Sequence, residues 1–180
     1  STAKGSKYQQ KIDAVTLHIA YEGAVDEAEY FAQLSKSIPR QFQALLRLIP
    51  VKKSSTASAP SKVYDDLCLH LEAHRVKLNA GSDLAFMVID RDHHFTGNHQ
   101  QSTRTAVNAC KQRNIDVICS TPSFDLWLLC HYVDISQCSD DYKATALANK
   151  KVSADNTFLK LEVSKVRNGE SIKALLKHTA

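Results

Sequence analysis

The chain has 180 residues, of which 43% are hydrophobic and 23% are charged. This length suits one ordinary domain with its own core, and the composition excludes a largely disordered chain. The formal net charge of +4 is compatible with a phosphate-bearing partner without requiring one. No apolar run approaches the ~20 residues that a membrane-spanning helix needs.

Cysteine usage points to a reducing compartment. The five cysteines form no CxxC pair, and their odd number argues against a disulfide framework. Several lie in apolar runs, so they are predicted to be buried free thiols. Nothing at the start of the chain resembles a signal peptide. We therefore expect a cytoplasmic protein.

The first elements predicted are a flexible segment, a strand and a helix. Residues 1–12 are polar and expected to be flexible. The β-branched run 14–21 predicts a strand that stops at the turn signal Glu22-Gly23. Apolar residues at helical spacing then predict a helix over 26–35.

The middle of the chain continues this alternation. Residues 44–51 fit a strand, although periodicity alone does not exclude a helix there. The continuous apolar run 84–89, which ends in Asp90, is typical of a central parallel strand covered on both faces. The remaining predicted elements are helices over 62–78, 100–114 and 124–132, a strand over 115–119, and helical stretches between 134 and 180.

Strands that alternate with helices predict an α/β fold with a mostly parallel sheet flanked by helices. No internal repeat and no strong linker divides the chain. Residues 13–135 are predicted to form the main domain, and residues 136–180 a helical extension packed on the same domain.

Acidic side chains follow two of the predicted strands. Glu22 comes directly after the first strand, and Asp90 and Asp92 come at the end of the central one. Functional groups gather at the carboxyl ends of strands in such sheets. Alternation along an extended chain sends Asp90 and Asp92 to the same side. If the two strands are neighbours, three carboxylates converge there.

Converging carboxylates repel one another and therefore need a cation. Mg²⁺ or Mn²⁺ accepts a few carboxylate ligands and leaves positions for water and substrate phosphate. A strand-end Asp is also a common turn or helix-cap residue, and a lone DxD favours that interpretation. The second acidic signal, at Glu22-Gly23, shifts the balance towards a metal site.

Three sequence blocks resemble signatures of RloB-like proteins, the relatives of AbiLii. EGAVDEAEYF at 22–31 resembles their EGxxTExxYF, and VIDRDHH at 88–94 resembles their second signature. STPSFDLWLLCHY at 120–132 resembles SNPCFELWLLLHF. The order and approximate spacing of the blocks agree over roughly residues 14–135. Asp26, Thr121, Ser123 and Asp125 depart from the family residues, mostly with conserved polarity or charge.

This resemblance implies a Toprim-like catalytic domain over 13–135. Glu22 would be the strand-end glutamate that acts as acid/base or metal ligand, and Asp90 and Asp92 would be the metal-binding pair. RloB-like proteins are encoded beside restriction or abortive-infection loci, often with an ATPase partner of the AAA or ABC type. A role in antiphage defence is therefore expected.

Three further residues are candidates for supporting roles around the metal or the substrate. Glu27 lies in the first turn of a predicted helix, where an acidic side chain can stabilise the helix through its dipole without any role in a site. His94 follows the DxD and could contact phosphate, although a solvated loop histidine is the simpler interpretation. His131 ends an apolar helix, where a buried, hydrogen-bonded histidine is the common case. Trp127, in the same helix, is expected in the core.

Two other sets of residues are assigned no function. His70 and His74 have the spacing of a zinc-binding helix, but the Glu that a HExxH protease needs is absent. The lysines that flank the Ser/Ala/Pro-rich loop are interpreted as exposed side chains; they are Lys52, Lys53 and Lys62.

The sequence therefore predicts a metal-dependent nuclease that hydrolyses phosphodiester bonds of DNA or RNA. A non-catalytic subunit that binds nucleic acid or an ATPase is the alternative. A phosphatase of the DxDx[TV] type is disfavoured because His94 occupies the last position of that motif. The choice among DNA, RNA and tRNA, and self-association, stay open.

Overall fold

The computed structural model describes residues 14–78, 81–91, 95 and 97–176. The segment 1–12, expected to be flexible, lies outside the described residues. Four strands form one sheet in the order β2-β1-β3-β4, and every neighbouring pair is parallel. The strands are β1 (Val15–Tyr21), β2 (Leu46–Pro50), β3 (Asp83–Asp90) and β4 (Ile115–Ser120).

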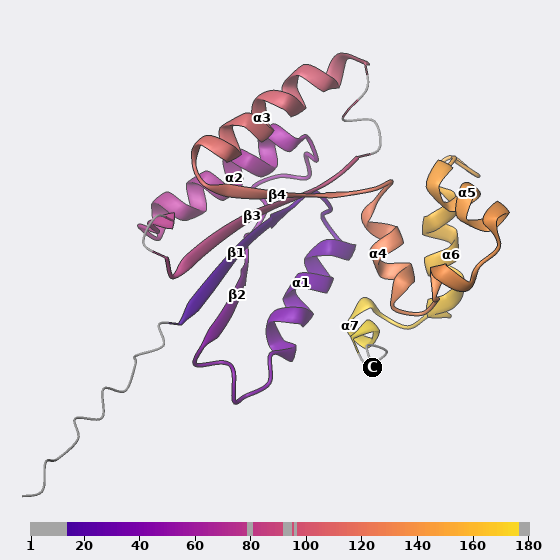
Figure 1. Cartoon of the computed structure of the whole chain (residues 1–180), viewed down its shortest axis with the longest axis horizontal. Coiled ribbons are helices and arrows are strands. Elements are labelled where there is room, and N and C mark those ends of the chain that lie inside the picture. Colours follow the sequence, from indigo (N-terminus) through magenta and orange to yellow (C-terminus); the bar gives the residue numbers. More distant parts are fainter. Residues whose placement is uncertain (1–13, 79–80, 92–94, 96, 177–180) are drawn as a thin grey trace, which may run out of the picture.

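Helices cover both faces of this sheet (Figure 1). Helices α2 and α3 lie together on one face, and α1 and α4 lie on the other. The α-helices are α1 (Asp26–Ser37), α2 (Pro60–Ala73), α3 (Gln100–Gln112), α4 (Phe124–Cys130), α5 (Asp140–Ala148), α6 (Phe158–Arg167) and α7 (Ile172–Leu175). The prediction of an α/β fold is confirmed, and the described sheet is parallel throughout, in a Rossmann-like arrangement.

The ambiguous run 44–51 contains a strand. Leu46–Pro50 pairs with β1 at the edge of the sheet, and Leu48 is buried below α1. A short apolar run is undecided between helix and strand until a neighbour offers it hydrogen bonds. Here β1 supplies these hydrogen bonds, and in the resulting parallel pair Leu17 lies opposite Leu48.

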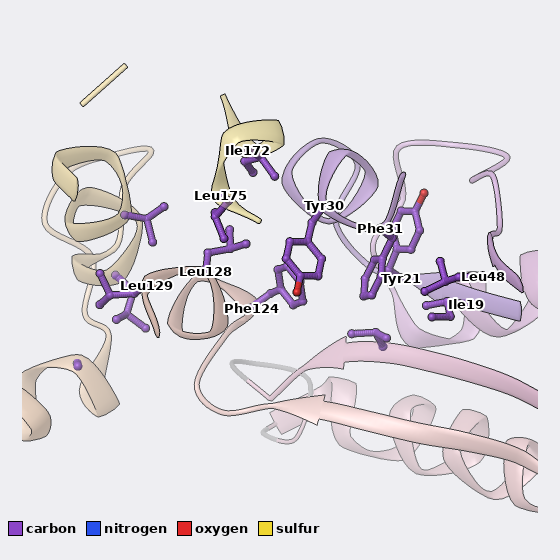
Figure 2. Close-up of a cluster of buried hydrophobic side chains, with 14 residues drawn as sticks. Ile19, Tyr21, Tyr30, Phe31, Leu48, Phe124, Leu128, Leu129, Ile172 and Leu175 are labelled. Carbon is purple, nitrogen blue, oxygen red and sulfur yellow. The ribbon is translucent and has the colours of Figure 1, made fainter. Parts of the chain in front are cut away.

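The two faces bury separate apolar clusters. On the α2/α3 face, Met87 and Leu67 are completely buried between the sheet and the helices. On the other face, the ring of Tyr30 packs against that of Phe124 at 5.4 Å between centroids, which joins α1 to α4 (Figure 2). Burial of such side chains stabilises the fold by about 1.5–3 kcal/mol each.

The carboxy-terminal helices share the second cluster. Leu159 of α6 and Leu175 of α7 are fully buried in the same cluster as Leu128 of α4. Figure 2 shows Ile172 and Leu175 next to α4 and α1. The cluster therefore runs continuously from the sheet into the helices that follow residue 135. None of the described helices is long and apolar enough to cross a membrane.

Two predictions about burial are wrong. Trp127 is 52% exposed, because it lies on the face of α4 opposite the side that buries Leu128 and Leu129. Cys119 and Cys130 are also exposed. An apolar run that forms an amphipathic element still has an outer face, and the residue type does not tell which residues occupy it. All five cysteines are free, as expected.

Candidate acidic site at the carboxyl edge of the sheet

Glu22 and Asp90 lie side by side at the carboxyl edge of the sheet. β1 and β3 are neighbours, and their register continues to Tyr21 opposite Val88. The Glu22 N–H donates to the carbonyl oxygen of Val88 at 3.1 Å, which carries the pairing one residue further. The Asp90 N–H then donates to Oε2 of Glu22 at 3.1 Å. The predicted convergence of these two strand ends therefore occurs.

The carboxylate of Asp90 connects the central strand to the next helix. Its Oδ1 accepts a hydrogen bond from the Phe124 N–H, the first residue of α4, at 2.8 Å. The Arg91 N–H donates to the carbonyl oxygen of Ser120 at 2.8 Å, which holds the ends of β3 and β4 together. Backbone groups thus fix the position of the Asp90 carboxylate.

Glu27 is a third carboxylate at this edge. Glu27 lies in the first turn of α1 and is buried, with 9% of its surface exposed. Its carboxyl group folds back over Gly23. A Cβ on residue 23 would coincide with that carboxyl group. Residue 23 is therefore a glycine because any side chain there would occupy the space of the Glu27 carboxyl group. We call Glu22, Glu27 and Asp90 together the acidic edge.

The environment of Glu27 favours its protonated form. Burial, the largest cause, raises the pKa of Glu27 to about 7, although a backbone hydrogen bond opposes the shift. The negative charges of Asp125, Asp26 and Glu22 also raise this pKa. A carboxyl group with a pKa near neutrality can exchange a proton at physiological pH, as general acid/base catalysis requires.

Asp125 extends the acidic surroundings of Glu27 along α4. Burial raises the pKa of Asp125, and the charge of Asp26 raises it further, whereas Lys160 and a hydrogen bond with Ser123 lower it. Asp26, Asp125 and Lys160 line a pocket of about 420 Å³ between α1, α4 and α6. The sequence blocks contained Asp26 and Asp125, but only the fold brings them together.

Lys53 makes a contact with the acidic edge that the sequence did not indicate. Its ammonium group donates a hydrogen bond to the backbone carbonyl oxygen of Glu22, and its side chain is half-buried rather than exposed. This cation lies next to the turn that carries the first carboxylate. A lysine in a Ser-rich loop gives no signal of such a contact, because the contact joins residues from two different strand ends.

His131 caps the carboxy-terminal end of α4, between Tyr30 and Trp127. Its ring centroid is 5.6 Å from that of Tyr30 and 5.5 Å from that of Trp127, and burial lowers its pKa. Its Nε2 is buried and has no hydrogen-bond partner among the described residues. No described contact joins His131 to Glu22 or Asp90. Its suggested role beside the metal or substrate gains no support from this geometry.

Two predicted residues, Asp92 and His94, lie outside the described residues. Among the described side chains, no group of three or more His, Cys, Asp or Glu is arranged to hold a metal ion. Glu22 and Asp90 nevertheless offer carboxylate oxygens, the ligand type that Mg²⁺ and Mn²⁺ prefer. These two carboxylates from neighbouring strand ends therefore fit a hard divalent cation.

Comparison with known families identifies a family for most of the chain. The family model described as "RloB-like protein" matches residues 17–175. The chain belongs to the RloB-like family. The matched region includes Glu22, Glu27 and Asp90 and extends through α7, beyond the three sequence blocks. Searches of curated proteins and of solved structures found no match.

Proposed function

We propose that this RloB-like protein is a metal-dependent nuclease that hydrolyses phosphodiester bonds of DNA or RNA. The observation that supports it most is the position of Glu22 beside Asp90, at the carboxyl ends of adjacent parallel strands. The Glu22 carboxylate contacts the backbone of Asp90, and carboxylates gathered at one edge of a sheet favour binding of a cation or retention of a proton. Catalytic metal sites make use of this arrangement.

In the proposed mechanism, Glu22 and Asp90 would hold one Mg²⁺ or Mn²⁺ ion, with Asp92 as the further ligand expected from the sequence. The bound ion would neutralise charge on the scissile phosphate and acidify a water molecule. Asp90 keeps its orientation because the Phe124 N–H donates to it. Glu27, whose pKa is about 7, would serve as the general acid/base that accepts a proton from water or donates one to the leaving oxygen.

The decisive experiment measures cleavage of single-stranded DNA, double-stranded DNA and tRNA by the purified chain, with and without Mn²⁺. Asp90→Asn keeps a hydrogen-bond acceptor for the Phe124 N–H but removes the charge that holds the ion. We expect at least about a 100-fold loss of cleavage. Asp116→Asn, which neutralises an exposed carboxylate on β4, is the matched control and should retain cleavage. Full metal-dependent cleavage by Asp90→Asn would refute the proposal.

The biological setting is a further part of the proposal. We infer that the nuclease acts in antiphage defence in the cytoplasm, together with an ATPase partner of the AAA or ABC type. Its support is the family resemblance. Co-expression with a neighbouring ATPase should yield a stable complex and protection against phage that Asp90→Asn removes. A complex that protects equally well with Asp90→Asn would instead favour a non-catalytic subunit.

A further inference from the structure

A pocket of about 530 Å³ opens immediately beside the acidic edge. It is lined by Arg91, the residue after Asp90, and by Thr121 and Pro122 at the end of β4. Its opposite wall comes from the carboxy-terminal part of the chain, where Lys151 and Thr157 line it. The pocket therefore lies between the sheet and the extension that follows α4.

The charged side chains among the described lining residues are both positive. Arg91 and Lys151 contribute these two cations, and none of the lining residues that the structure describes is acidic. Neither cation takes part in an ion pair with the described residues. The two threonines add hydroxyl groups, while Leu147, which is 60% exposed, offers an apolar surface. Cations, hydroxyls and an apolar wall suit a phosphate attached to a sugar.

Hydrogen bonds at Asn149 and Lys151 shape the walls of this pocket. Asn149, at the end of α5, donates from Nδ2 to Oγ of Ser123 at 3.4 Å, next to the β4–α4 connection. Its Oδ1 accepts from the Leu159 N–H at 2.9 Å, which fixes the start of α6. An antiparallel bridge pairs Lys151 with Thr157. The Asn149–Ser123 bond crosses from one wall to the other, and the other two contacts brace the carboxy-terminal wall, so the pocket is formed before any ligand arrives.

We propose that this pocket binds a backbone phosphate of the nucleic-acid strand, next to the phosphodiester bond that is cut. The inference rests on the proposed nuclease function and adds the path of the substrate. The acidic edge attracts a cation but repels phosphate, so the strand needs a separate anchor. Arg91, the residue after Asp90, and Lys151 supply this anchor. The nucleic-acid strand would then leave the acidic edge over α5, which contributes Leu147 to the pocket.

The test measures binding rather than cleavage. Fluorescence anisotropy with labelled single-stranded DNA, duplex DNA and tRNA is recorded in Ca²⁺, which occupies Mg²⁺ sites without supporting turnover. Lys151→Ala removes one cation of the pocket. Lys150→Ala is the matched control, because Lys150 is the adjacent exposed lysine but lines a different pocket with Val152 and Phe158. Thermal melting confirms that each variant is folded.

Lys151→Ala should weaken binding of at least one of these nucleic acids about 5- to 10-fold and reduce the salt dependence by about one phosphate contact. Lys150→Ala should change binding by less than about twofold. Equal losses for both lysines, or no loss for Lys151→Ala, would overturn the inference, as would an absence of binding by the unmodified chain. Lys151-dependent binding without cleavage would refute the nuclease function alone. If Lys151→Ala cleaves and binds nucleic acid as well as the unmodified chain, the phosphate-binding role of the pocket is refuted and the nuclease function is not.

Discussion

The two ends of the β1–β3 pair both carry buried ionisable side chains, but they are satisfied in different ways. Towards the amino end, the buried ring of His18 lies 3.0 Å from Oδ1 of Asp83 and 3.0 Å from Nε2 of His70. In both hydrogen bonds a donor meets an acceptor, so the Asp83 carboxylate is paired with the imidazole of His18. At the carboxyl end, Glu22 and Asp90 lie next to each other and accept from backbone N–H groups.

This difference separates a structural cluster from a functional candidate. A closed histidine–aspartate chain stabilises the fold, because its polar groups pair with one another inside the protein. An edge that gathers several carboxylates, here Glu22, Glu27 and Asp90, favours binding of a cation or retention of a proton. The same pair of strands thus supports a stabilising network near one end and the proposed metal site at the other.

The largest expected effect comes from replacing a carboxylate by its amide at each end. Glu22→Gln can still accept from the Asp90 N–H, so stability should change little while cleavage falls at least about 100-fold. Asp83→Asn should retain cleavage within about twofold but lower stability by about 1 kcal/mol. Cleavage assays and urea unfolding of both variants check this. A stronger cleavage defect in Asp83→Asn would reverse the comparison.

The next effect concerns the closed network. His18→Ala removes a buried ring and both of its hydrogen bonds, so the free energy of unfolding should fall by about 2–4 kcal/mol. His74→Ala is the control, because His74 is exposed at the end of α2 and should cost less than about 1 kcal/mol. Chemical denaturation at pH 8 compares the two. Equal costs would show that the network contributes nothing.

A smaller effect should appear at Glu27. Its folded pKa of about 7 exceeds the ordinary value of 4.5, so the unfolded chain loses its proton first as the pH rises. Stability is fully present below pH 4.5 and is lost as the pH rises through 7. Glu27→Gln should therefore stabilise the protein by about 2 kcal/mol at pH 8 and have little effect at pH 4.5.

Metal-free unfolding curves at the two pH values measure this effect of Glu27. Glu29→Gln, in the same turn of α1, is the control for the loss of a carboxylate from this turn. A Glu27→Gln variant that is equally stable relative to the parent protein at both pH values would contradict the raised pKa.

The smallest predicted effect has the opposite sign. Burial, followed by the charges of His74 and His18, lowers the pKa of His70 below its ordinary value of 6.5. Protonation therefore favours the unfolded chain, and stability is lost as the pH falls below 6.5. His70→Gln should therefore lose less free energy of unfolding than the parent protein when the pH falls from 7.5 to 5.5. Unfolding curves at these two pH values measure the difference. An unchanged loss would assign it to another group, such as His131.

The sequence alone determined the alternation of elements, and with it the α/β class and the strand-end positions of Glu22 and Asp90. Hydrophobic periodicity and turn residues act locally, so they can be interpreted one segment at a time. The same local signals left residues 44–51 undecided and assigned Trp127 to the core, because exposure depends on which neighbour covers a side chain.

Only the tertiary structure decided which side chains meet. Strand order places β1 beside β3, and this pairing brings Glu22 to Asp90 and His18 to Asp83. It also folds Glu27 over Gly23 and sets Lys151 opposite Arg91 across one pocket. These contacts join residues that are far apart in sequence or belong to different elements. Their energies arise from packing of the whole chain, so no single stretch of sequence could reveal them.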